Sequence, residues 1–128
     1  MDAAFSITAD PARDLVVMRL TGFFTPADLE RFVAERRIVH GTLRCGPNRH
    51  LTLADTSRIS IQSQEMVARF GAMLADPAYR SRRLAFVTGS SLARMQLQRA
   101  IGSRDAQVFT DEREAMAWLF AAEASAAA

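Results

Sequence analysis

The segment from Gln107 to Phe120 (QVFTDEREAMAWLF) constrains the fold more than any other part of the chain. Val108-Phe109 reads as a short buried strand, after which Thr110 or Asp111 offers a side-chain oxygen to the free N–H groups of a helix. Asp111 and Glu114 have the spacing of a capping box. The expected buried face of this helix consists of Ala115, Trp118, Leu119 and Ala122. A strand followed by a capped amphipathic helix is typical of the closing unit of an α/β domain.

The preceding sequence predicts the same alternation of strands and helices. Apolar runs predict strands at Phe5–Ala9, Leu15–Leu20, Leu51–Ala54 and Leu84–Thr88. Turn and cap residues predict helices that begin after Thr25, Ser63 and Ser91. The sequence therefore predicts an α/β fold in a single domain, with a mixed, mostly parallel sheet of about five strands, an N-terminal antiparallel hairpin and four helices in the order ββαβαβαβα.

The apolar periodicity of the first two helices assigns their buried faces. In the first helix these residues are Leu29, Phe32, Val33 and Ile38. In the second helix they are Met66, Val67, Phe70, Met73 and Leu74. Methionine fills irregular cores and also lines adaptable apolar pockets, so the methionine-rich faces are compatible with both roles.

The length of 128 residues fits one domain, which we expect to span 1–121, with 122–128 as an alanine-rich tail that frays. The first ten residues hold Asp2 and Asp10 and no continuous apolar run, so we expect no secretory signal. No apolar stretch approaches the length of a bilayer span, and we expect no stable membrane insertion and a cytoplasmic location.

Charge and reactive side chains argue against several functions. The net charge is only +2, and all 16 basic residues are arginines spread along the chain, so we expect no nucleic-acid partner. Cys45 is the single cysteine and is expected to be an inert thiol. His40 and His50 flank a loop without a catalytic or metal-ligand spacing. We therefore expect no metal, no cofactor and no catalytic residue.

Three segments carry a resemblance to a known family. They are Leu15–Phe32 (LVVMRLTGFFTPADLERF), Leu51–Asp55 (LTLAD) and Val108–Leu119 (VFTDEREAMAWL). With these segments the chain resembles the STAS-like domains of the anti-sigma-factor-antagonist superfamily, in its SpoIIAA-like (STAS/SEC14-type) branch. The resemblance covers nearly the whole chain and implies a compact regulatory or ligand-binding module that is not an enzyme.

The resemblance also implies a candidate phosphoacceptor. Antagonists of this superfamily carry a phosphorylatable serine, usually within Asp-Ser-Ser-Gly, where a helix begins after the third-strand region. This chain reads Ile61-Gln62-Ser63-Gln64 there, without the aspartate and the glycine. Ser63 is the nearest position and is the candidate phosphoacceptor.

The predicted topology places three loops at one edge of the sheet, because parallel strands share their carboxyl ends. These loops are Gly22–Thr25, Asp55–Ser63 and Gly89–Ser91, and ligands of open α/β sheets bind at such edges. The candidate ligand- or partner-binding residues are Phe23, Phe24, Asp55, Ser57, Arg58, Ser90 and Ser91.

Each candidate also has a structural interpretation. Ser63 and Ser91 are good helix caps, and Asp55 is suited to bonding its own loop. Phe23 and Phe24 are adjacent, so an extended backbone would point one into the core and expose the other.

Two hypotheses on function follow. The first is a non-enzymatic regulatory or protein-interaction module with a regulatory protein partner at the three-loop edge. The alternative is a carrier or sensor of a small apolar or lipid-like ligand, which requires a deep apolar cavity.

We also expect a homodimer, formed through one of two surfaces. The first is the edge strand Phe5–Ala9, which lacks lysine and proline. The second is a patch on the last helix with Met116 and Phe120 exposed.

Overall fold

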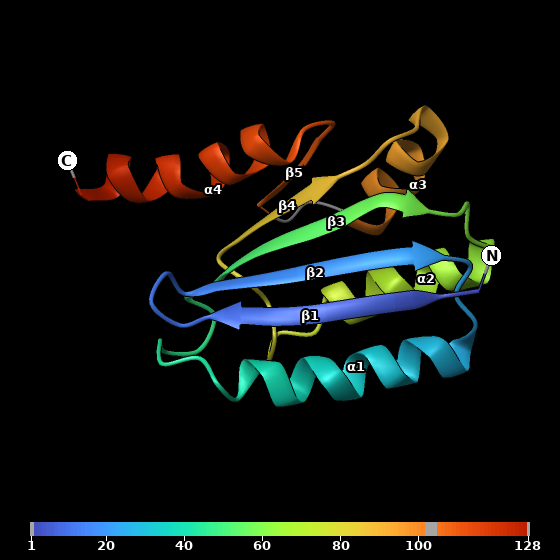
Figure 1. The fold of residues 1–128 in the computed structure, drawn as a ribbon, viewed down its shortest axis with the longest axis horizontal. Coiled ribbons are helices and arrows are strands. Elements are labelled where there is room, and N and C mark those ends of the chain that lie inside the picture. Colours follow the sequence, from blue (N-terminus) through green and yellow to red (C-terminus); the bar gives the residue numbers. More distant parts are fainter. Residues whose placement is uncertain (1, 102–104, 128) are drawn as a thin grey trace.

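The computed structural model describes residues 2–101 and 105–127 (Figure 1). Its strands and helices follow in the order β1 (Ala4–Asp10), β2 (Leu15–Gly22), α1 (Pro26–His40), β3 (Leu51–Ile59), α2 (Gln64–Leu74), β4 (Arg83–Val87), α3 (Ser91–Ile101), β5 (Ala106–Phe109) and α4 (Glu112–Ala127). This is the predicted order ββαβαβαβα.

The five strands form one mixed sheet in the order β1-β2-β3-β4-β5. β1 and β2 pair in antiparallel fashion as the predicted hairpin, and all other neighbours are parallel. Consecutive strands are neighbours throughout, so the crossover helices connect adjacent parallel strands. The predicted fold class is thereby confirmed.

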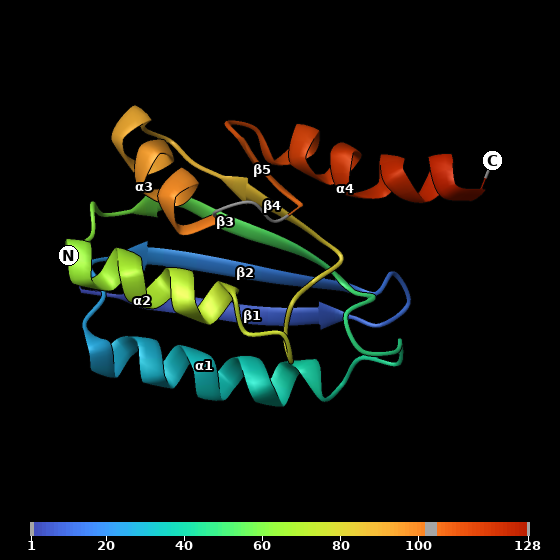
Figure 2. The same ribbon diagram turned by 180° about the vertical axis from the view of Figure 1, so that it is seen from behind.

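Helices cover both faces of the sheet (Figures 1 and 2). On one face, Met18 and Phe86 pack with side chains of α1, α2 and α3. On the other face, Leu53 and Ala85 pack against Leu119 of α4. The alternation of side chains along β2, β3 and β4 supplies both faces, which explains why these central strands are apolar almost throughout.

Side-chain caps fix the helix starts that position the loops. Thr25 and Asp28 form a reciprocal capping box, with the Thr25 N–H donating to Asp28 at 2.8 Å. The Ser63 hydroxyl accepts the Met66 N–H at 3.1 Å, which confirms the predicted cap of α2. The cap of α4 is Asp111, whose carboxylate accepts the Arg113 N–H at 3.1 Å.

The predicted cap of the third helix was wrong by one residue. The hydroxyl of Ser90, not Ser91, accepts the Ala93 N–H at 3.0 Å, and the Ser90 carbonyl accepts the Arg94 N–H. Ser91 is the first residue of α3. Both serines satisfy the composition rule for a cap, so composition alone does not distinguish them.

The predicted buried face of α1 was wrong at Ile38, which is 66% exposed. The buried stripe of the helix runs through Leu29, Phe32, Arg36 and Val39. These positions follow the helical spacing, whereas Ile38 lies outside it. The prediction selected residues because they were apolar rather than by their position on the helix. It therefore included Ile38 and missed the buried Arg36.

Strand β3 is longer than predicted and includes residues assigned to a loop. Asp55 pairs with both neighbouring strands, opposite Arg19 of β2 and Val87 of β4. Beyond it β3 continues along β2 alone, with Arg58 opposite Thr21. Asp55, Ser57 and Arg58 therefore lie on a strand that projects past the end of β4. The polar residues of this extension had obscured it in the sequence.

The last helix buries Ala115 and Leu119, as predicted, while Trp118 is half-buried. Ala122 lies outside the described side chains. Met116 and Phe120 were expected to be exposed, but both are half-buried and pack against the core cluster beneath α4. The helix itself continues to Ala127, so the end of the domain at residue 121 remains a prediction.

Candidate functional site

The carboxyl ends of β2, β3 and β4 meet at one edge of the sheet, which we call the docking edge. It comprises the loops Gly22–Thr25 and Ser60–Ser63 and the turn Gly89–Ser91. The turn lies close to β3, since a Cβ added at Gly89 would be 3.0 Å from the Ser57 carbonyl oxygen. A side chain at position 89 would therefore push the turn away from the strand.

Gln62 joins two of these loops and is only 8% exposed. Its amide oxygen accepts the Phe24 N–H at 2.9 Å. Its amide nitrogen donates to the carbonyl oxygens of Gly22 at 3.0 Å and Ser60 at 2.6 Å. One side chain thus satisfies three backbone groups and fixes the loop after β2 against the loop after β3.

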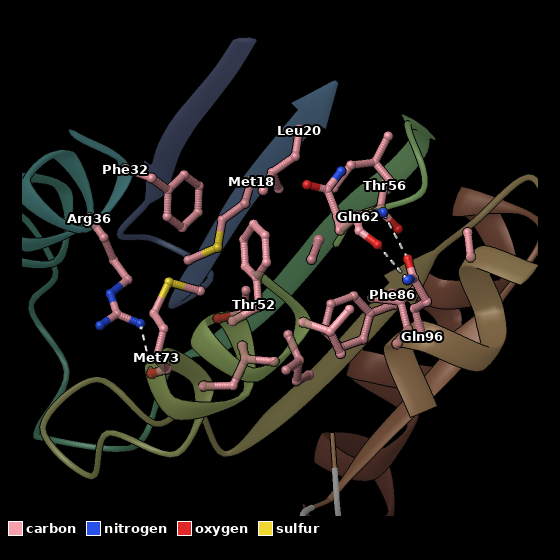
Figure 3. A pocket seen from close by; sticks show the side chains of 18 of the residues that line it. Met18, Leu20, Phe32, Arg36, Thr52, Thr56, Gln62, Met73, Phe86 and Gln96 are labelled. Carbon is pink, nitrogen blue, oxygen red and sulfur yellow. Dashed lines mark hydrogen bonds between the residues drawn. The ribbon is translucent and has the colours of Figure 1, made fainter. Parts of the chain in front are cut away.

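Gln96 connects helix α3 to the backbone of Gln62. Its amide oxygen accepts the Gln62 N–H at 3.0 Å, and its amide nitrogen donates to the Gln62 carbonyl at 2.8 Å. Figure 3 shows the two glutamines side by side beneath the edge. Side-chain amides therefore connect the two loops and α3 at the docking edge.

Large apolar side chains protrude from the docking edge. Phe23 is 42% exposed, Ile61 is 39% exposed and Leu92 is 54% exposed. Phe23 directly precedes Phe24, and Ile61 directly precedes Gln62; the backbone N–H groups of Phe24 and Gln62 donate to the two glutamine side chains. Leu92 lies one helical turn before Gln96. Phe24 points the other way and is fully buried, so the predicted divergence of the two phenylalanines is confirmed.

The polar candidates lie on the same edge of the sheet. Ser57, Arg58, Ser90 and Ser91 are all exposed. Ser63 is exposed as well, while its hydroxyl caps α2. The structure thus brings the predicted edge residues into one region, with Phe24 beneath it.

Asp55 has both carboxylate oxygens engaged. One oxygen accepts the Ser57 N–H at 3.0 Å and the Ser57 hydroxyl at 2.7 Å, and the other accepts from Arg19 at 2.8 Å. Burial raises the pKa of Asp55, but the bonds from Ser57 and Arg19 outweigh it and hold the pKa below its usual value. Arg19 also pairs with Glu112 at 2.7 Å, which ties the strand to α4.

A cavity of about 80 Å³ lies between the sheet and helices α1, α2 and α3 (Figure 3). Its apolar wall comes from Met18, Leu20, Phe32, Ala54, Ile59, Val67, Phe70, Met73, Leu74, Leu84, Phe86, Ala93 and Leu97. Its polar groups come from Arg36, Thr52, Thr56, Gln62, Tyr79, Ser81 and Gln96. Ligand pockets for drug-sized molecules measure roughly 300–1,000 Å³, so this cavity suits a much smaller guest.

Arg36 is the charged residue in this wall and is only 4% exposed. Its Nη1 is 3.4 Å from the Met73 carbonyl oxygen, and its guanidinium lies 4.5 Å from the centre of the Tyr79 ring. The nearest described carboxylate is Asp76, 4.0 Å from Nη2. Burial lowers the pKa of Arg36, against a weaker opposing effect of Asp76, but an arginine remains protonated in proteins.

The two histidines, which the sequence left without partners, contact each other. Their Nε2 atoms are 3.2 Å apart, and His40 Nδ1 is 2.9 Å from the Arg36 carbonyl oxygen. The His40 ring also meets the Tyr79 ring edge-on at 5.3 Å. Burial lowers the pKa of His40 and outweighs the hydrogen bond to the Arg36 carbonyl, which raises it, while the nearby charge of Arg36 also lowers it.

The described parts of the chain contain neither a metal-binding cluster nor a membrane-spanning helix. No group of three or more histidine, cysteine, aspartate or glutamate side chains there is arranged to hold a metal ion. Within the same residues, no helix has both the length and the apolar character of a membrane span.

Sequence reasoning missed Gln62, Gln96 and Arg36. A buried glutamine resembles any loop or helix glutamine, and only the folded chain reveals its backbone partners. Arg36 did carry a signal, because it follows Leu29 and Phe32 on the buried stripe of α1. A charged residue on an apolar stripe is a useful indicator of a buried functional group.

No family model and no curated protein matches the sequence. A solved structure does match the fold: an uncharacterised protein of the DUF3478 family with a SpoIIAA-like fold, from Shewanella loihica PV-4. The two chains are 15% identical and superpose with a TM-score of 0.66, over 91% of this chain and 93% of the other. The protein is therefore an α/β domain with a SpoIIAA-like fold, as the sequence resemblance implies.

Proposed function

We propose that the chain is a non-enzymatic regulatory module that binds a partner protein at its docking edge. The observation that carries this proposal is the exposure of Phe23, Ile61 and Leu92 next to the loops that Gln62 connects. Exposed apolar clusters with polar rims are typical of protein interaction sites, and aromatic anchors supply much of their affinity. Arg58 and the neighbouring serines provide the rim.

The chemistry of the edge supports a binding role over catalysis. Asp55, the most obvious candidate base, uses both oxygens to hold Ser57 and Arg19 in place. A general base works best with a pKa near the operating pH, and these bonds hold the pKa of Asp55 below its usual value. The sequence resemblance to anti-sigma-factor antagonists supports a regulatory role for such an edge.

The test is affinity capture from the native cell extract on the immobilised chain. Phe23→Ser and Leu92→Ser should each abolish capture of a specific protein, because each removes an apolar anchor. Ile38→Ser is the matched control: Ile38 is also an exposed apolar residue, but it lies on α1. Arg58→Ala should weaken capture through the rim. Equal capture by Phe23→Ser, Leu92→Ser and Ile38→Ser would contradict the proposal.

The alternative function, a carrier or sensor of a small apolar or lipid-like ligand, is favoured by one observation, the apolar cavity under α2. Phe70 and Met73 of α2 line it and are only half-buried, so an outward shift of α2 would enlarge it. At about 80 Å³ the present cavity is too small for a lipid chain. Native mass spectrometry tests this alternative: a retained lipid-sized mass supports it, and the bare chain mass counts against it.

A further inference from the structure

We propose that the groove between α2 and α3 binds one amphipathic helix of the partner protein, with acidic residues beside the apolar stripe of that helix. This inference rests on the proposed function and specifies the chemistry of the partner. The groove begins at the docking edge, because Gln64 and Leu92 line it and lie in the first turns of α2 and α3.

The two helices form the groove with matching stripes of residues. They contact each other on one face of the sheet (Figure 2), and a groove of about 630 Å³ lies between them. In both helices the lining positions are i, i+3, i+4 and i+7, so each helix presents a stripe two turns long. At a rise of about 1.5 Å per residue, each stripe is about 10 Å long. The lining residues are Gln64, Val67, Ala68 and Gly71 of α2, and Leu92, Met95, Gln96 and Arg99 of α3.

The groove exposes an apolar wall on α3 and small residues on α2. Leu92 is 54% exposed and Met95 is 52% exposed, and a methionine side chain adapts its shape to the surface that covers it. Opposite them, Ala68 and Gly71 carry little or no side chain. Since the distance between packed helices depends on the side chains at the contact, a third helix can approach α2 closely here.

The backbone around the groove selects a helix as the occupant. A partner strand would need unpaired N–H and C=O groups of a sheet edge, whereas α2 and α3 use these groups in their own hydrogen bonds. A partner helix satisfies its own backbone and needs only side-chain contacts. A lipid surface needs apolar side chains that project from the fold, whereas Ala68 and Gly71 line a hollow. Two turns of a helix with apolar residues at i, i+3 or i+4, and i+7 match the groove.

The charges of the two helices select an acidic partner. Arg99 lines the groove and is exposed, and no carboxylate of the described residues forms an ion pair with it. Helix α3 carries Arg94 as its second charged residue and contains no acidic residue. The two charges of α2, Glu65 and Arg69, pair with each other at 3.1 Å. An Asp or Glu of the partner helix therefore complements Arg99 at the end of the apolar stripe.

The experiment is a selection from a random library of displayed peptides on the immobilised full chain. The peptides are about 15 residues long, a length at which isolated helices become stable. Enriched peptides should carry apolar residues at i, i+3 or i+4, and i+7, and more Asp and Glu than Lys and Arg. Enriched peptides without this period, an excess of basic residues, or the absence of enrichment would overturn the proposal.

Ala68→Glu tests the position of the bound peptide, because it places a longer, negatively charged side chain in the groove. The affinity for the most enriched peptide, measured by fluorescence anisotropy, should fall at least about tenfold. Ala72→Glu is the matched control: Ala72 is an exposed alanine of the same helix outside the groove lining, and its variant should bind as the parent chain does. Equal affinities of the two variants would refute the assignment to the groove.

Arg99→Glu tests the charge complementarity and should also weaken the peptide at least about tenfold. Arg94→Glu is its control, because it changes the net charge equally from an exposed position of α3 outside the groove lining, and it should retain binding. An equal loss in both variants would show an effect of net charge alone and would contradict a direct contact with Arg99.

Capture from the cell extract separates this inference from the proposed function. If Phe23→Ser abolishes capture and Ala68→Glu leaves it unchanged, the docking edge binds the partner and the groove assignment is wrong. If Ala68→Glu abolishes capture and Phe23→Ser does not, the groove assignment stands and the docking edge does not bind the partner. Binding of the parent chain to phosphatidylglycerol vesicles, without any enriched peptide, would identify a lipid surface as the occupant and overturn the proposal.

Discussion

Replacing Gln62 with methionine should lower the free energy of unfolding, because the loops after β2 and β3 lose the side chain that joins them. Methionine has nearly the same length and shape, so Gln62→Met removes hydrogen bonds without opening a cavity. The lost bonds are those to the Phe24 N–H and to the carbonyls of Gly22 and Ser60. At about 1 kcal/mol each they sum to about 3 kcal/mol. The apolar side chain recovers about 1 kcal/mol by burial, which leaves a loss of about 2 kcal/mol.

Urea unfolding followed by circular dichroism measures this loss, and thermal unfolding should show a midpoint lower by roughly 8 °C. Gln64→Met is the matched control, since Gln64 is exposed at the start of α2, and its effect should stay within about 0.5 kcal/mol. Indistinguishable stabilities of the two variants would refute the view that Gln62 holds the docking edge together.

Three further predictions concern acid stability, phosphorylation and assembly. Because the pKa of His40 is lower in the folded chain than in the unfolded chain, the free energy of unfolding should fall as the pH drops below about 6.5. Urea unfolding between about pH 7 and pH 5 should show a smaller loss of stability for His40→Gln than for the parent chain. An equal loss in both would contradict this prediction. Ser63→Asp, which mimics phosphorylation, should weaken partner capture while Ser63→Ala does not; equal capture by both would exclude the switch. Light scattering should give twice the chain mass of 14.1 kDa for a homodimer, and a single chain mass would rule it out. The half-buried position of Phe120 favours β1 as the interface, so Phe120→Glu should leave the dimer intact.

The fold could be predicted because its determinants are local. The Thr25 cap, the Ser63 cap and the apolar runs of the central strands each specify their element within a few residues. Their order then restricts the topology to a mostly parallel sheet. The same local rules selected Ser91 as the cap of α3, whereas Ser90 is the cap, because both serines satisfy these rules and the position where the chain leaves β4 decides between them.

The candidate site could be predicted only in part, because its main contacts join distant segments. The polar end of β3 was assigned to a loop, although pairing with β2 carries it to Ile59. The pairing of Gln62 with Gln96 spans both α2 and β4, and no periodicity signals it. The prediction placed Ile38 on the buried face of α1 because it is apolar, and it omitted Arg36 because it is charged. In the structure the helical spacing buries Arg36 and exposes Ile38.

The most direct test of the docking edge places a photo-crosslinking residue, p-benzoylphenylalanine, at position 61 or at position 38 of the chain in its native cells. Both positions are exposed, but only Ile61 lies at the docking edge. Irradiation should give a discrete adduct with another protein from position 61 and none from position 38. An adduct of twice the chain mass would instead identify a second copy of the chain as the occupant. The same adducts from both positions, or none from position 61, would contradict the proposed function.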